Sequence, residues 1–270
     1  MKRTAIMICA AVVAISAAAV GQSKPATTPA AAQTAPAGKR PPQAKTQPEF
    51  EAYKTAAALT DPAAQEKAAD DFAAKFPDSE LRALLYKSVM HGYQSANNAD
   101  KMMAMSQKVL TYDPDDPEAL LGVAQVLAER TKSTDADHEA KFAEARKDAE
   151  RSLVTVDTDV PTAGQPPEKV DAYKGYLRSE AYAILGTLDY NANNWAQAET
   201  NLKKSIDAFP QQPDPVAVLR LSLSLDHQDK YPDALKYANQ AVDLTQAGTN
   251  AGDAARNEKS RLIQLIGGIQ

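Results

Sequence analysis

The stretch from Ser179 to Leu244 constrains the fold more strongly than any other part of the chain, because it contains one pattern twice. Three pairs of marker residues are each separated by 36 positions: Trp195 and Tyr231, Ala198 and Ala234, and Ser205 and Ala241. An offset shared by independent markers indicates an internal repeat, and a repeat of this length is typical of solenoids and other arrays. The sequence therefore predicts that copies of one small unit stack on each other.

Each copy has the pattern of two short amphipathic helices joined by a turn. In the first copy, Leu185 and Leu188 belong to an apolar stripe at helical spacing, and Asn193-Asn194 interrupts it. A second stripe follows between Trp195 and Ile206. Apolar residues at spacings of three and four predict helices with one buried side, and consecutive asparagines indicate a turn. We therefore expect one helical hairpin in each copy.

Small residues at the predicted contact between the two helices set how closely they pack. Gly186 on the first helix and Ala198 on the second allow a close approach, because the distance between helix axes depends on the side chains at the contact. Pro210 ends the second helix, since proline cannot continue the backbone hydrogen bonds. A single hairpin cannot bury its apolar face alone, and this explains why the unit recurs.

These residues resemble the tetratricopeptide repeat, a helix-turn-helix unit of 34 residues. Five residues fall on the pattern of that family: Tyr182, Leu185, Gly186, Ala198 and Pro210. Leu202 stands where the family usually has phenylalanine, and Asp189 where it usually has tyrosine. The resemblance implies an α-solenoid whose concave groove binds extended peptides or partner helices.

Composition and further copies of the pattern extend this prediction to most of the chain. Apolar residues make up 44% of the sequence but aromatic residues only 6%, which suits closely packed helices and not a β-sandwich. We expect an all-α solenoid of about four to five tetratricopeptide-like hairpins over residues 49–270, with a C-terminal capping helix. The expected repeats are 49–77, 83–114, 117–153, 179–210 and 215–244, and the expected cap is 251–266.

The first residues have the pattern of an export signal over 1–21. Met1–Arg3 is basic, Ile6–Val20 is apolar, and Gly21 ends a small-residue cleavage site. Cys9, the only cysteine, lies inside the apolar stretch, so we expect a mature chain without disulfides or thiolate sites. We predict a periplasmic or secreted protein without a stable membrane span after cleavage. An uncleaved anchor is the alternative.

Residues 22–48 are rich in proline and alanine, which predicts a disordered linker between the signal and the folded body. Six of the 30 basic residues precede Glu49, and the other 24 stand against all 35 acidic residues. The body therefore carries a net charge near −11. Because nucleic acid binding requires basic side chains to neutralise phosphates, we expect no nucleic acid partner.

The sequence contains no recognisable catalytic, cofactor or metal motif. The phosphate-binding loop, the dinucleotide glycine fingerprint and the Gly-x-Ser-x-Gly elbow are all missing. The three histidines have no paired ligand spacing: His91, His138 and His227. We therefore predict that the protein is not an enzyme, has no catalytic residues and no metal site, and binds no cofactor.

The resemblance also implies which residues line the groove, since positions 5, 9, 12 and 13 of each repeat face it. The candidates for binding a partner are Lys87, His91, Gln94, Gln125, Thr187, Asn191, Leu219, Leu223 and Asp226. Equivalent positions also hold Ser95, Leu121, Ala128, Glu129, Ala183, Tyr190 and His227. The two leucines of the last repeat could instead pack against a neighbouring or capping helix.

Two functions remain open at this point. The first is a non-enzymatic scaffold in the bacterial cell envelope or periplasm, binding a segment of a partner protein in the groove. Of the lysine and asparagine pairs with which some family members clamp a terminal carboxylate, only Lys87 is present, which favours an internal segment of the partner. The alternative is an accessory subunit of a secreted or cell-wall enzyme complex that binds peptide or polysaccharide.

Overall fold

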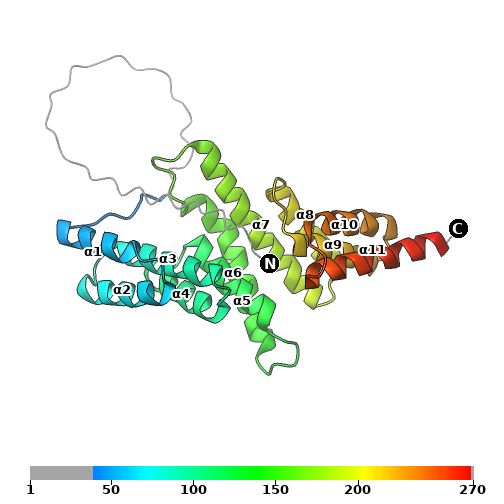
Figure 1. The fold of residues 1–270 in the computed structure, drawn as a ribbon, viewed down its shortest axis with the longest axis horizontal. Helices are drawn as coiled ribbons and strands as arrows, with labels where there is room; N and C mark the ends of the chain where they lie inside the picture. The colour runs from blue at the N-terminus through cyan, green and yellow to red at the C-terminus, as the bar shows by residue number, and fades with distance from the viewer. Residues whose placement is uncertain (1–38, 269–270) are drawn as a thin grey trace, which may run out of the picture.

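A computed structural model describes residues 39–268, and within that range the chain forms eleven α-helices and no β-strand (Figure 1). The helices are α1 (Gln47–Ala57), α2 (Pro62–Lys75), α3 (Leu81–Ser95), α4 (Ala99–Tyr112), α5 (Pro117–Arg130), α6 (His138–Thr158), α7 (Pro167–Asn191), α8 (Trp195–Ala208), α9 (Pro215–Asp226), α10 (Tyr231–Leu244) and α11 (Asn250–Gly268). The expected export signal, Cys9 and residues 22–38 of the expected linker lie outside the described residues.

The helices pair in chain order into five hairpins, and each hairpin packs on the next. The hairpins are α1 with α2, α3 with α4, α5 with α6, α7 with α8, and α9 with α10, and α11 covers the last of them. Figure 1 shows an elongated molecule with α1 to α6 in one half, α8 to α11 in the other, and the long α7 between them. The predicted fold class, an all-α solenoid of tetratricopeptide-like hairpins, is confirmed.

Three of the hairpins turn through a left-handed residue. Asn97, Asn193 and Asp229 have φ angles of 54°, 59° and 58°, which non-glycine residues adopt mainly when they are Asn or Asp. In each turn the next amide donates to a carbonyl five residues earlier, as in a Schellman motif. These bonds run from Asn98 to Tyr93 at 2.9 Å, from Asn194 to Asp189 at 2.9 Å, and from Lys230 to Leu225 at 3.0 Å. The same backbone device therefore recurs along the solenoid.

Small side chains lie where the sequence placed the close contact between α7 and α8. A Cβ atom added to Gly186 would lie 2.6 Å from Cγ and 3.2 Å from the backbone nitrogen of Leu202. Ala198 is fully buried at the same contact. The predicted reason for the glycine is confirmed, because any side chain there would separate the two helices.

Aspartate followed by proline starts three helices. The side chains of Asp61, Asp116 and Asp214 each accept a hydrogen bond from a backbone amide in the first turn, at 2.8, 2.9 and 3.0 Å. The proline that follows occupies the first helical position, where its missing N–H breaks no bond. These caps fix where α2, α5 and α9 begin.

Asp189 replaces the usual tyrosine because it is the centre of a buried polar contact among three helices. Its side chain is 3% exposed and accepts hydrogen bonds from Arg146 on α6 at 2.6 Å and from Asn201 on α8 at 2.7 Å. A buried carboxylate is tolerated only when its oxygens are paired. This contact joins the third hairpin to the fourth.

The last ten residues of the expected linker, 39–48, differ from the prediction. Residues 39–46 lie against the hairpins, and α1 begins at Gln47. Thr46 and Glu49 form a capping box, in which each side chain accepts a bond from the backbone of the other. The proline-rich composition concealed this Thr-x-x-Glu helix start.

We predict that Gly186→Ala lowers the free energy of unfolding by about 1–3 kcal/mol, because the new methyl group would overlap Leu202. Gly267→Ala is the control, since a Cβ atom at Gly267 meets nothing within 4 Å. The control should be neutral or slightly stabilising, because alanine is the better helix former. Urea unfolding of both variants measures the difference, and equal midpoints would contradict the assignment of this contact.

Candidate functional site

Side chains from four successive hairpins, most of them on the first helices, line two adjoining hollows, which together we call the inner groove. The first hollow lies between α3, α4, α5 and α7 and is lined by Met90, Gln94, Met102, Glu118, Leu121, Gly122, Gln125, Tyr176, Leu177 and Glu180. The second lies between α5, α7 and α9 and is lined by Gln125, Ala128, Glu129, Glu180, Ala183, Ile184, Thr187, Asp214 and Arg220. Gln125 and Glu180 belong to both, so the two hollows adjoin each other.

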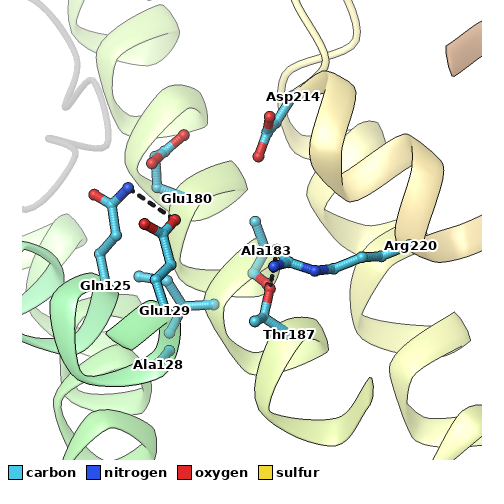
Figure 2. Close-up of a pocket in the computed structure, with 9 residues that line it drawn as sticks. Gln125, Ala128, Glu129, Glu180, Ala183, Thr187, Asp214 and Arg220 are labelled. Atoms are coloured by element: carbon cyan, nitrogen blue, oxygen red, sulfur yellow. Dashed lines mark hydrogen bonds between the residues drawn. The ribbon is translucent and has the colours of Figure 1, made fainter. Parts of the chain in front are cut away.

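The second hollow has an acidic rim and a small apolar floor (Figure 2). Gln125 donates its side-chain amide to Glu129 Oε1 at 3.2 Å, and Arg220 Nη1 donates to Thr187 Oγ1 at 2.9 Å. Figure 2 shows the carboxylates of Glu180 and Asp214 on either side of the opening. The hollow is therefore lined by hydrogen-bond donors and acceptors from three successive hairpins.

A polar cluster lies at the N-terminal end of the inner groove and joins α3, α5 and α7. We call Lys87, His91, Asp116, Glu118 and Tyr173 the polar cluster. The Lys87 ammonium forms an ion pair with Asp116 and lies 3.7 Å from Glu118. His91 Nε2 lies 2.5 Å from Glu118 Oε1, and the Tyr173 hydroxyl donates to Glu118 Oε2 at 2.8 Å. Glu118 is therefore the shared acceptor.

Burial and opposite charges move the pKa values of this cluster in different directions. Burial alone would raise the pKa of Glu118, but His91, Lys87 and Tyr173 stabilise its carboxylate and lower the pKa to about 2. Burial alone would lower the pKa of His91 and of Lys87. For His91, the carboxylate of Glu118 outweighs burial and raises the pKa. For Lys87, the nearby carboxylates, Asp116 first among them, do the same. Burial together with Glu118 raises the pKa of Tyr173.

These shifts define the pH range in which the cluster stabilises the fold. The contribution of His91 is complete below its ordinary pKa of 6.5 and is lost as the pH rises through its higher folded-state value. The contribution of Glu118 is present above its ordinary pKa of 4.5 and is lost as the pH falls through about 2. The pair His91–Glu118 is therefore strongest between about pH 4.5 and 6.5.

Three of the nine candidate residues line the inner groove, and three others on α3 and α7 are tied to neighbouring helices. Gln94, Gln125 and Thr187 line its hollows. Lys87 and His91 belong to the polar cluster, where their charges are already paired. Asn191 lies near the end of α7 and donates its side-chain amide to the carbonyl of Ala128 at 3.5 Å, which ties α7 to α5.

The three candidates on α9 do not face an open groove. Leu219 is 7% exposed and packs in one apolar cluster with Val218, Ala241 and Ala255, and Leu223 is packed against that cluster. Asp226 forms an ion pair with Arg261 of α11. The terminal helix α11 lies against α9, where the first helix of another hairpin would lie. The two leucines therefore pack against the capping helix, which is the alternative that the sequence left open.

Four acidic or basic residues of the groove lie outside both the candidates and the equivalent repeat positions: Glu118, Glu180, Asp214 and Arg220. Glu118 and Glu180 stand three positions before Leu121 and Ala183, which are equivalent positions of two repeats. A spacing of three keeps residues on one helix face, so this match was a readable signal. Arg220 gave no such signal, because no other repeat has a basic residue at its position, and Asp214 was readable only as a helix cap.

Among residues 39–268, no group of three or more His, Cys, Asp and Glu side chains is placed to hold a metal ion. In the same part of the chain, no helix combines the length and the apolar character needed to cross a bilayer.

Several solved structures have a similar fold, PilW and Acl4 among them. The sequence matches no protein-family model and no curated protein. Among solved structures, the fold is similar to that of PilW, described as a widely conserved type IV pilus biogenesis factor. The sequence identity is 20%, the TM-score is 0.49, and the match covers 82% of this chain and 93% of that one. It is also similar to Acl4, an assembly chaperone of RpL4, with 10% identity, a TM-score of 0.45 and coverage of 82% and 98%. At these scores the likenesses carry no functional assignment.

We predict that Glu118→Gln lowers the pKa of His91 from above 6.5 to below it. The substitution removes the carboxylate that holds the imidazolium. Burial, the largest influence, and the charge of Lys87 remain and oppose protonation, and only the weaker attraction of Asp116 still favours it. Nuclear magnetic resonance titration of the imidazole protons measures the value, and the signals of His138 serve as an internal control. A pKa of His91 that is the same in both proteins would refute the ion pair.

We predict that Leu219→Ala lowers the free energy of unfolding by about 2–5 kcal/mol, as large-to-small changes in a core do. Leu244→Ala is the matched control, because Leu244 is 38% exposed and should lose less than about 1 kcal/mol. Urea unfolding followed by circular dichroism measures both. If Leu219→Ala is as stable as the control, then Leu219 is a surface residue and not part of the core.

Proposed function

We propose that this protein is a tetratricopeptide-type, non-enzymatic scaffold of the bacterial cell envelope, which binds an extended segment of a partner protein in its inner groove. The observation that carries the proposal is the convergence of polar side chains from α5, α7 and α9 on one hollow. Three successive hairpins contribute to that hollow, so the repeat architecture itself builds the binding surface.

An extended peptide fits this surface because its donors and acceptors recur along its length. Neighbouring packed helices are about 8–10 Å apart. An extended chain advances about 3.3 Å per residue, so about three residues pass each hairpin. Gln125 and Arg220 can donate to backbone carbonyls, and Glu129 can accept from backbone amides. Such contacts bind the backbone of the peptide and depend less on its side chains.

The polar cluster favours an internal segment over a C-terminal carboxylate. Lys87 would be the cation for such a carboxylate, but its side chain is only 21% exposed and is paired with Asp116 and Glu118. A second carboxylate would have to compete with both. The partner segment therefore contributes amides, carbonyls and side chains and no terminal carboxylate.

The envelope location rests on the sequence of residues 1–21, which has the order of charges and apolar residues of an export signal. The partner is a protein and not nucleic acid, since the body from Glu49 onward carries 35 acidic and 24 basic residues. The helical domain, 49–270 as expected from the sequence, is the binding part. Cofactors, metals and catalytic residues have no place in the proposal.

We predict that a photo-crosslinking amino acid placed at Gln94 or Gln125 captures one defined envelope protein from intact cells. Both residues line the inner groove and are only partly buried. The same amino acid at Lys67 or Lys147, exposed residues of the second helices α2 and α6, is the control and should capture far less. Mass spectrometry of the adducts identifies the partner and the segment that is bound.

Capture at Lys67 and Lys147 as strong as at the groove positions would contradict the proposal. The alternative function, an accessory subunit that binds peptide or polysaccharide of the cell wall, predicts a different result. In that case the purified chain sediments with isolated cell wall from which proteins have been stripped. A scaffold for a partner protein remains in the supernatant.

A further inference from the structure

Residues 39–46 run across the ends of hairpins that follow them in the chain. In Figure 1 this dark blue segment passes from beside the connection between α6 and α7 to the start of α1. The backbone amide of Lys39 donates to the carbonyl of Thr158 at 3.0 Å, across more than a hundred positions of sequence. The segment therefore returns over two hairpins before the first helix begins.

Lys39 occupies a site with two carboxylates and two helix ends. Its ammonium forms an ion pair with Asp113 and donates to Asp159 Oδ1 at 3.3 Å. Asp113 and Asp159 are the residues that follow the last turns of α4 and α6. The C-terminal end of a helix carries partial negative charge, so the two helix ends add to the attraction of the two carboxylates. Both carboxylates are about four-fifths buried, which limits screening by solvent.

Arg40 and Gln43 share a second acceptor, Glu80, at the start of α3. The Arg40 guanidinium donates to both Glu80 oxygens at 2.5 and 2.8 Å. The backbone amide of Gln43 donates to the same carboxylate at 3.2 Å. The hydrogen bonds from Arg40 lower the pKa of Glu80, although burial opposes the shift. Pro41 and Pro42 lie between the two donors and hold this part of the chain extended.

These contacts couple hairpins that do not touch each other. In a solenoid each repeat normally contacts only its neighbours. Residues 39–46 are joined covalently to α1 of the first hairpin, while Glu80 and Asp113 belong to the second and Asp159 to the third. Because the segment is attached to α1, its ion pairs form within one molecule at a high effective concentration.

We propose that Glu80, Asp113, Asp159 and the Thr158 carbonyl form a binding surface for a basic, extended segment, and that its occupant is Lys39–Gln43 of the same chain. We call these four groups the strap surface, and residues 39–46 the strap. The strap holds Lys39 against Thr158, at the end of α6. It also links the third hairpin to the first.

The first test is carbodiimide coupling of the full chain at low ionic strength, which joins amines to carboxylates that are in contact. We expect a bond between Lys39 and Asp113 or Asp159, found by mass spectrometry after proteolysis. Lys108 and Asp70 are the positive control, because they pair between α4 and α2 at 2.6 Å. In an equal mixture of unlabelled and ¹⁵N-labelled chains, the coupled peptides should carry one isotope only.

The second test is amide exchange in matched variants. In the parent chain the amides of Lys39 and Gln43 should exchange at least about tenfold more slowly than in an unstructured peptide. Lys39→Gln with Arg40→Gln should abolish this protection and leave the amides of α3 and α5 protected. Lys54→Gln with Lys67→Gln removes the same charge from pairs within α1 and α2 and should leave the strap protected.

Three results would overturn the inference. The first is unprotected Lys39 and Gln43 amides in the parent chain. The second is absence of the Lys39 bond in a sample in which Lys108 and Asp70 are coupled. The third is coupled peptides of mixed isotope, which would show that the strap surface holds the strap of a second copy.

Discussion

The close contact between α7 and α8, the two helices of the fourth hairpin, is the constraint on which the centre of the structure depends. At Gly186 and Leu202 there is no room for another carbon atom, and Ala198 is buried beside them. Helices this close turn their remaining apolar faces outward from the hairpin, so the next hairpin must cover them. That stacking places the first helices side by side and gives the inner groove its lining.

Paired charges hold the stacked hairpins at fixed positions and shape the groove between them. Asp189 joins α6, α7 and α8, and Glu118 joins α3, α5 and α7. Asp116 and Asp113 lie on one connection, between α4 and α5. Asp116 forms an ion pair with Lys87 of the polar cluster, and Asp113 forms one with Lys39 of the strap. The strap surface and the polar cluster thus share the connection between α4 and α5.

Local rules made most of the fold readable from the sequence. Asp-Pro pairs, Asn-Asn turns and small residues at the helix contact each act within a few positions, so the sequence alone indicates them. The burial of the three α9 candidates could not be predicted, because the same periodicity describes a helix that faces solvent and a helix that α11 covers. Leu219 therefore looked like part of the groove and is part of the core.

Contacts between residues far apart in the sequence were not predicted, for a related reason. Lys39 meets Asp159 across 120 positions, and proline-rich composition concealed it. Glu118 and Glu180 share a helix position in two repeats, but the family's groove positions do not include theirs. The sequence thus predicts where helices lie and which sides they bury. Which charged side chains meet depends on how the hairpins are rotated against each other, and short-range patterns do not specify that rotation.

The aromatic contact at the far end of the solenoid has a practical consequence. Trp195, at the start of α8, stacks on His227, which follows α9, with ring centres 4.0 Å apart and planes inclined by 10°. Tyr190 meets the indole edge-on at 5.2 Å. Trp195 is the sole tryptophan of the chain. Its fluorescence is thus a built-in optical reporter of one junction, between the fourth and fifth hairpins, and stays silent about the N-terminal half.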